Sequence, residues 1–112
     1  MRASPAAALL ALAACAPSAT VRATVSGGEA TFVWTGAADA VWLVGTPTAW
    51  QRVPLARDGR RFTLRLPVAP GRHEYRLEVD VGGAVRTVLP DGAERVDDGF
   101  GGENAVLRVA GS

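Results

Sequence analysis

Residues 71–80 read Gly-Arg-His-Glu-Tyr-Arg-Leu-Glu-Val-Asp. Uncharged, mostly apolar side chains alternate with charged ones along this stretch, which is the pattern of a β-strand with one buried face. The same alternation recurs around Phe32 and around Leu64, and turns at 58–59 and 91–92 contain Asp-Gly. No segment carries the 3.6-residue apolar repeat of an amphipathic helix. The chain is therefore expected to consist of strands.

The chain is long enough for one domain with a modest core. It has 112 residues, of which 48% are hydrophobic and 21% charged. About seven short antiparallel strands, each with one apolar face, bury those faces when two sheets pack together. We therefore expect an all-β, immunoglobulin-like antiparallel β-sandwich. Trp34 shares its parity with Phe32 and is expected in the core.

The first residues have the composition of an export signal. One positive charge at Arg2 precedes an Ala- and Leu-rich run over 5–14, which is too short to span a bilayer as a permanent helix. The tetrad that ends in Cys15, Leu-Ala-Ala-Cys, resembles the lipobox of bacterial lipoproteins. This resemblance implies that Cys15 becomes a lipidated first residue, and Ala16 after it implies retention at the outer membrane. The alternative is ordinary cleavage, in which Cys15 is incidental.

These features divide the chain into three expected parts. Residues 1–14 form a lipoprotein signal peptide, 15–28 hold the lipidated cysteine and a tether, and 29–110 form the sandwich. The expected location is the cell envelope, on the periplasmic face of the outer membrane or at the cell surface. The expected membrane contact is the lipid on Cys15.

The charges favour no polyanionic partner. The formal net charge is +1, from 12 basic residues, all arginine, and 11 acidic ones. The arginines are scattered among the acids without a run, so the sequence suggests neither nucleic acid nor an anionic membrane face as a partner.

Catalytic and metal chemistry has little support in the sequence. The single histidine, His73, lies on the inward parity of its strand, where a hydrogen-bonded core residue is the simpler interpretation. The chain has no Gly-x-Ser-x-Gly elbow and no Cys/His cluster. The acidic loop at 97–98 matches no calcium-loop spacing. We therefore expect no enzyme activity, no cofactor and no metal.

An ordered set of motifs carries a family resemblance. The segments are TFVWTG at 31–36, VWLVG at 41–45, GRHEYR at 71–76 and DDGFGGENAVL at 97–107. Together they resemble the glycogen-binding module of the AMP-activated protein kinase β subunit, an early-set fold that recurs in isoamylases and glycogen branching enzymes as carbohydrate-binding module family 48. The resemblance covers about residues 30–109. It implies a non-catalytic domain that binds α-1,4-glucan, such as glycogen or starch, on one face.

The resemblance implies a site made from Trp50, Arg76 and Asn104. The indole of Trp50 would stack on a glucose ring, and the guanidinium of Arg76 and the amide of Asn104 would bond sugar hydroxyls. Each residue has an alternative role. Trp50 can cover the edge of the core, Arg76 can pair with Glu74 or Glu78, and Asn104 can satisfy its own backbone as a turn residue.

One family feature is missing. Where the family has a second stacking Trp, residues 79–85 read Val-Asp-Val-Gly-Gly-Ala-Val. One stacking contact is worth about 1–3 kcal/mol. Phe100 and Trp42 are candidates for a replacement ring, although Phe100 also suits a plug under its Gly-rich loop. The alternative function is therefore a sandwich that has lost sugar binding and serves as a protein–protein or structural envelope module.

Overall fold

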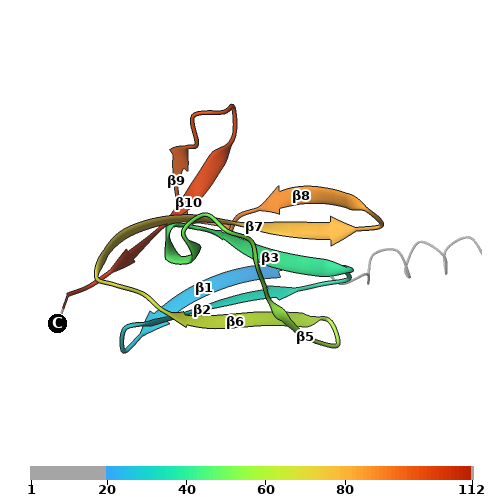
Figure 1. The fold of residues 1–112 in the computed structure, drawn as a ribbon, viewed down its shortest axis with the longest axis horizontal. Coiled ribbons are helices and arrows are strands. Elements are labelled where there is room, and N and C mark those ends of the chain that lie inside the picture. The colour runs from blue at the N-terminus through green and yellow to red at the C-terminus, as the bar shows by residue number, and fades with distance from the viewer. Residues whose placement is uncertain (1–19, 112) are drawn as a thin grey trace, which may run out of the picture.

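Two antiparallel β-sheets pack face to face in the computed structural model, which describes residues 20–111 (Figure 1). The four-stranded sheet has the order β1-β2-β6-β5, and the six-stranded sheet has the order β4-β3-β7-β10-β9 with β8 paired to β7. The expected all-β sandwich is confirmed. The strands are β1 (Thr20–Ser26), β2 (Glu29–Thr35), β3 (Ala40–Gly45), β4 (Val53–Pro54), β5 (Ala56–Asp58), β6 (Arg61–Pro67), β7 (Gly71–Val81), β8 (Ala84–Val88), β9 (Glu94–Asp97) and β10 (Glu103–Val109).

The core lies between the two inner faces, where the apolar positions of the alternating strands meet. Phe32 of β2 and Tyr75 of β7 cross this interface with ring centroids 5.0 Å apart in an edge-to-face arrangement. Within the four-stranded sheet, Trp34 lies opposite Phe62 with centroids 5.7 Å apart. Each fully buried side chain of this size contributes about 1.5–3 kcal/mol. Burial also raises the pKa of Tyr75 to about 12, because the phenolate cannot be hydrated there.

The sandwich begins at Thr20, earlier than the expected boundary at residue 29. Residues 20–26, assigned from the sequence to the tether, form strand β1, which pairs along the whole of β2. The turn at 27–28 makes this pairing possible, because both glycines adopt positive φ, 60° and 76°. The alternate residues Val21, Ala23 and Val25 pack against the core. The expected signal peptide, Cys15 and residues 16–19 lie outside the described residues.

The described residues form ten strands where the sequence predicted about seven. Besides β1, the additional ones are short edge segments, of which β4 has two residues and β5 has three. No helix within residues 20–111 is long and apolar enough to cross a membrane.

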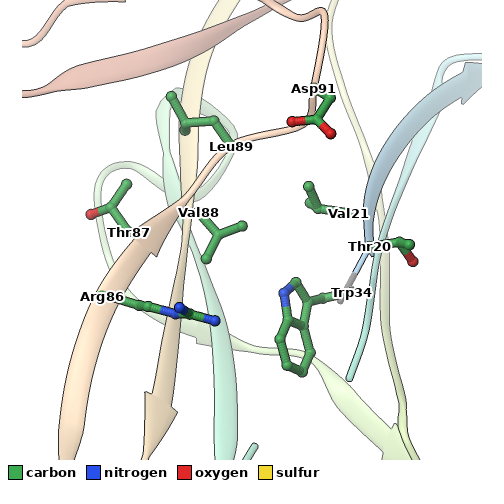
Figure 2. A pocket seen from close by; sticks show the side chains of 8 residues that line it. All are labelled: Thr20, Val21, Trp34, Arg86, Thr87, Val88, Leu89 and Asp91. Carbon is green, nitrogen blue, oxygen red and sulfur yellow. The ribbon is translucent and has the colours of Figure 1, made fainter. Parts of the chain in front are cut away.

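A hollow of about 580 Å³ separates the edge strand β1 from β8 and the segment that follows it (Figure 2). Trp34 lies at its base and is 1% exposed, as expected for a core residue. Arg86 extends toward the Trp34 ring from β8 (Figure 2), and Asp91 lies at the far side. The indole N–H of Trp34 is buried and has no hydrogen-bond partner among the described residues.

Candidate functional site

A groove of about 630 Å³ lies on the outer face of the six-stranded sheet. It brings together the three residues implied as a site, Trp50, Arg76 and Asn104, although they come from a loop and two different strands. Phe100 joins them, whereas Trp42 does not line the groove. The full lining is Val44, Trp50, Arg76, Glu78, Thr87, Asp98, Phe100, Gly102, Glu103 and Asn104.

Trp50 is held by a compact loop after β3. A short 3-10 helix (Thr46–Thr48) is followed by Ala49 and Trp50 in the left-handed region, with φ of 53° and 62°. The backbone N–H of Trp50 donates to the carbonyl of Gly45 at 2.8 Å, which closes the loop. Non-glycine residues rarely adopt positive φ, so the loop places the indole at the cost of backbone strain.

Three contacts attach this loop to the sheet. The hydroxyl of Thr46 accepts the N–H of Glu74 at 3.1 Å, and the hydroxyl of Thr48 accepts the N–H of Gly45 at 3.2 Å. The third contact is the close approach of Gly45 to β7, where a Cβ would lie 2.7 Å from the Cα of Tyr75 and still closer to the Glu74 carbonyl oxygen. Glycine is therefore required at position 45 for steric reasons.

The Trp50 side chain stands at the rim of the groove. It is 44% exposed, so a large part of the indole faces solvent. The guanidinium carbon of Arg76 lies 6.0 Å from the centroid of its ring, within the range of a cation–π contact. Val44 is buried beneath and contributes an apolar floor.

Arg76 also forms an ion pair with Glu78, one of the two partners that the sequence offered as an alternative to sugar contact. Its Nε donates to Glu78 at 3.0 Å, and Arg52 donates to the other carboxylate oxygen at 2.7 Å. Burial raises the pKa of Glu78, but the hydrogen bonds from Arg76 and Arg52 outweigh that effect and lower the pKa below its usual value. The Nη groups of Arg76 have no hydrogen-bond partner among the described residues. The ion pair therefore positions Arg76 and leaves donors for a ligand.

Asn104 is more enclosed than the resemblance implied. It lies near the start of β10 and is 3% exposed. Its Nδ2 donates to Glu74 at 3.4 Å, whereas its Oδ1 is buried without a partner among the described residues. Asn104 is part of a strand and not a turn residue. An orphaned acceptor at the groove wall suits a donor supplied by a ligand or water.

The β9–β10 loop presents Phe100 to solvent. The Oδ1 of Asp98 accepts the N–H of Phe100 at 2.7 Å and that of Gly102 at 3.0 Å. These two backbone hydrogen bonds, that of Phe100 first, lower the pKa of Asp98. Because Asp98 organises the turn from within, Phe100 points outward and is 94% exposed. The plug interpretation of Phe100 is therefore wrong.

Trp42 occupies a different place on the same face. It lies opposite Pro54 on one side and Glu78 on the other, and the guanidinium carbon of Arg52 is 4.7 Å from its ring centroid. Arg52 covers Trp42, so this ring supports the ion pair with Glu78 and not the groove. Trp42 was a candidate for an additional sugar contact, and the structure does not place it there.

Sequence reasoning missed part of the groove wall. Glu78 shares the outward parity of Arg76, so alternation along β7 was a usable signal. Thr87 carried no such signal, because its place depends on how β8 folds back onto β7. Within residues 20–111, no group of three or more His, Cys, Asp or Glu side chains is placed to hold a metal ion.

Comparison with known proteins identifies related sequences. The sequence model of a family described as "Glycogen recognition site of AMP-activated protein kinase" matches residues 29–111. The 5'-AMP-activated protein kinase subunit beta-1 of Sus scrofa is 32% identical over 59 residues, which are 53% of this chain and 48% of that protein. The subunit beta-1 of Rattus norvegicus is 37% identical over 49 residues, which are 44% of this chain and 18% of that protein. The matched stretch thus spans about half of one relative and less than a fifth of the other.

A solved structure shares the fold. It is a mutant pullulanase from Paenibacillus barengoltzii complexed with maltotetraose, with a TM-score of 0.60 and 22% identity, and the match covers 82% of this chain and 15% of that chain. At this level of identity the likeness supports the sandwich architecture.

Proposed function

We propose a function from the premise that this chain belongs to the family of the glycogen recognition site of AMP-activated protein kinase. The protein is a non-catalytic binding module for α-1,4-glucan chains of the glycogen or starch type. Its binding surface is the groove between Trp50 and Phe100.

The observation that carries this proposal is the convergence of aromatic and polar groups on one groove. Arg76 covers one side of the Trp50 indole, and the exposed part of that ring offers an apolar surface for the C–H face of a glucose unit. The free Nη groups of Arg76 supply hydrogen bonds to hydroxyls, and the amide of Asn104, enclosed in the groove wall, offers one unpaired acceptor. An aromatic platform beside a few oriented polar groups is the arrangement that a sugar requires.

Phe100 compensates in part for the missing second tryptophan. It stands on the opposite loop from Trp50 and lines the same groove. A glucan chain lying in the groove would then contact one ring from each loop. Phenylalanine offers a smaller face than tryptophan, so we expect weak to moderate affinity.

Anchoring to the cell envelope is a second part of the proposal. It is supported by the resemblance of the sequence around Cys15 to a lipobox. Two or more acyl chains on that cysteine would hold the protein stably at a membrane. Incorporation of labelled fatty acid into the wild type but not into Cys15→Ser tests this part, and equal or absent incorporation would contradict it.

Affinity electrophoresis in a glycogen-containing gel tests the glucan proposal. The chain from Ala16 to Ser112 is used, because residues 20–111 contain all the described strands and the core. We expect retardation of the wild type and a loss of about one to two decades of affinity in Trp50→Ala, the value of one stacking contact. Trp50→Phe keeps a ring and should retain part of the binding. Val81→Ala, which removes an exposed apolar side chain outside the groove, is the control.

The alternative function makes the opposite prediction. A sandwich that has lost sugar binding would migrate equally in gels with and without glycogen, and Trp50→Ala would change nothing. That result would leave a protein–protein or structural envelope module as the function.

A further inference from the structure

The fold separates charges that are interleaved along the sequence. The four-stranded sheet and its β5–β6 turn hold five arginines against two acids, a net charge of +3. The rest of residues 20–111 holds six arginines against nine acids, a net charge of −3. The described domain is therefore neutral overall but dipolar, with the glucan groove on its acidic side.

The two sheets also differ in how many of their arginines form ion pairs. The five ion pairs of the described residues all lie on the six-stranded sheet and its adjoining loops, where they use every arginine except Arg86. None of the arginines of the four-stranded sheet forms an ion pair with a described residue. Their charge is therefore not neutralised by ion pairs within the described residues.

Three of these arginines project from the outer face of the four-stranded sheet. Arg22 lies on β1, and Arg61 and Arg65 lie on β6, all three on the parity opposite to the core residues and all exposed. The cross-strand partners of Arg22 and Arg65 are Val33 and Thr31, which carry no charge. We call these three residues the basic face.

A small hollow lies on this face beside Arg22 and Arg61. It has a volume of about 140 Å³ and is lined by Thr20, Arg22, Thr35 and Arg61, together with two valines. Two guanidinium groups and two hydroxyls around a space of this size form a set of donors suited to a phosphate group. Asp58 is the cross-strand neighbour of Arg61 in the β5–β6 register, but it does not line the hollow.

We propose that the basic face docks on an anionic lipid surface, with a lipid phosphate in the hollow between Arg22 and Arg61. This places the four-stranded sheet against the membrane. The glucan groove, on the outer face of the other sheet, then points away from the membrane toward its ligand.

The point at which the chain enters the domain favours a membrane over other anionic partners. Thr20, the first described residue, lines the hollow itself. Cys15 precedes it by five residues, which span at most about 18 Å when extended. A lipid on that cysteine would therefore hold the basic face close to the surface. The docking does not require the lipid, because the attraction of basic side chains to anionic headgroups is independent of it.

Sedimentation with vesicles tests this inference on the unlipidated chain from Ala16 to Ser112. The vesicles contain equal parts of phosphatidylcholine and phosphatidylglycerol, and phosphatidylcholine vesicles are the reference. Each arginine near an anionic surface changes the partition coefficient about fivefold, so R22Q/R61Q/R65Q should lower it about 100-fold. The matched control R72Q/R95Q/R108Q makes the same change in net charge on the other sheet and should retain most of the binding. The lysine triple R22K/R61K/R65K should also bind.

Three results would overturn the proposal. The first is equal binding of the wild type to both vesicle types. The second is an equal loss of binding in the two glutamine triples, which would indicate an effect of net charge only. The third is a basic-face triple that loses self-association in sedimentation but binds vesicles as the wild type does. The partner of the basic face would then be the acidic side of a second copy of the chain. Retardation in glycogen gels should be unchanged in the basic-face triple, whose residues lie outside the groove, so failure of the glucan proposal is distinguishable from failure of this one.

Discussion

Arg76 lies between Glu78 and Trp50, with its Nε 3.0 Å from the Glu78 carboxylate and its guanidinium carbon 6.0 Å from the indole centroid of Trp50. The carboxylate thus orients the cation, and the cation covers one side of the ring. The exposed part of the indole and the free Nη groups of Arg76 face the same groove. This relationship connects the strand that carries the charges with the loop that carries the ring.

Removal of the Phe100 ring should weaken glucan binding and leave stability unchanged. Phe100 is almost fully exposed, so its truncation removes little buried surface from the fold. We expect Phe100→Ala to lower affinity in glycogen gels about three- to tenfold, and Phe100→Trp to raise it, because a larger ring covers more of a sugar. Val85→Ala, another exposed apolar side chain outside the groove, is the control. Equal affinities for Phe100→Ala and the wild type would exclude Phe100 from the site.

Glu78 should make the domain sensitive to acid. Its pKa in the folded protein is lower than the ordinary value of 4.5, because hydrogen bonds from Arg76 and Arg52 outweigh burial. Such a carboxylate stabilises the fold above its unfolded pKa, and this contribution is lost as the pH falls through the folded pKa. The melting temperature of Glu78→Gln should therefore decline less steeply than that of the wild type below about pH 4.5.

The control for this measurement is Glu29→Gln. Glu29 is exposed and forms no ion pair with a described residue. Its variant should follow the wild-type acid profile. If Glu78→Gln also followed that profile, the ion pairs of Glu78 with Arg76 and Arg52 would not contribute to stability.

Addition of a methyl group at Gly45 should destabilise the domain and displace the Trp50 loop. A Cβ at this position overlaps the backbone of Glu74 and Tyr75. Overpacking of this kind costs about 1–3 kcal/mol, which lowers the melting temperature of a domain of this size by about 10 °C. Gly111→Ala is the control, because the nearest atom to its Cβ would be Pro70 Cβ at 4.0 Å. A Gly45→Ala protein with wild-type melting and glycogen retardation would show that the loop adapts.

The fold class and most of the core followed from the sequence. Period-two alternation around Phe32, Phe62 and Tyr75 specifies which side chain of each pair faces inward, because successive residues of a strand point to opposite faces. Strand β1 escaped prediction. Its inward residues Val21 and Ala23 are small and only partly buried, so the sequence of this segment resembles a polar tether. Only its pairing with β2 in the folded domain identifies it as a strand.

The sequence by itself determined the types of residue available for a site and, through alternation, the outward direction of Arg76. The tertiary structure alone decided that Trp50, Phe100 and Asn104 share one groove with it, because loops and strands far apart in the chain meet only when the sheet is assembled. It also decided the exposure of Phe100, through the hydrogen bonds that Asp98 accepts within its loop. The separation of charge has the same origin. Basic and acidic residues are interleaved along the chain, and they become separated only because the strands are assigned to two different sheets.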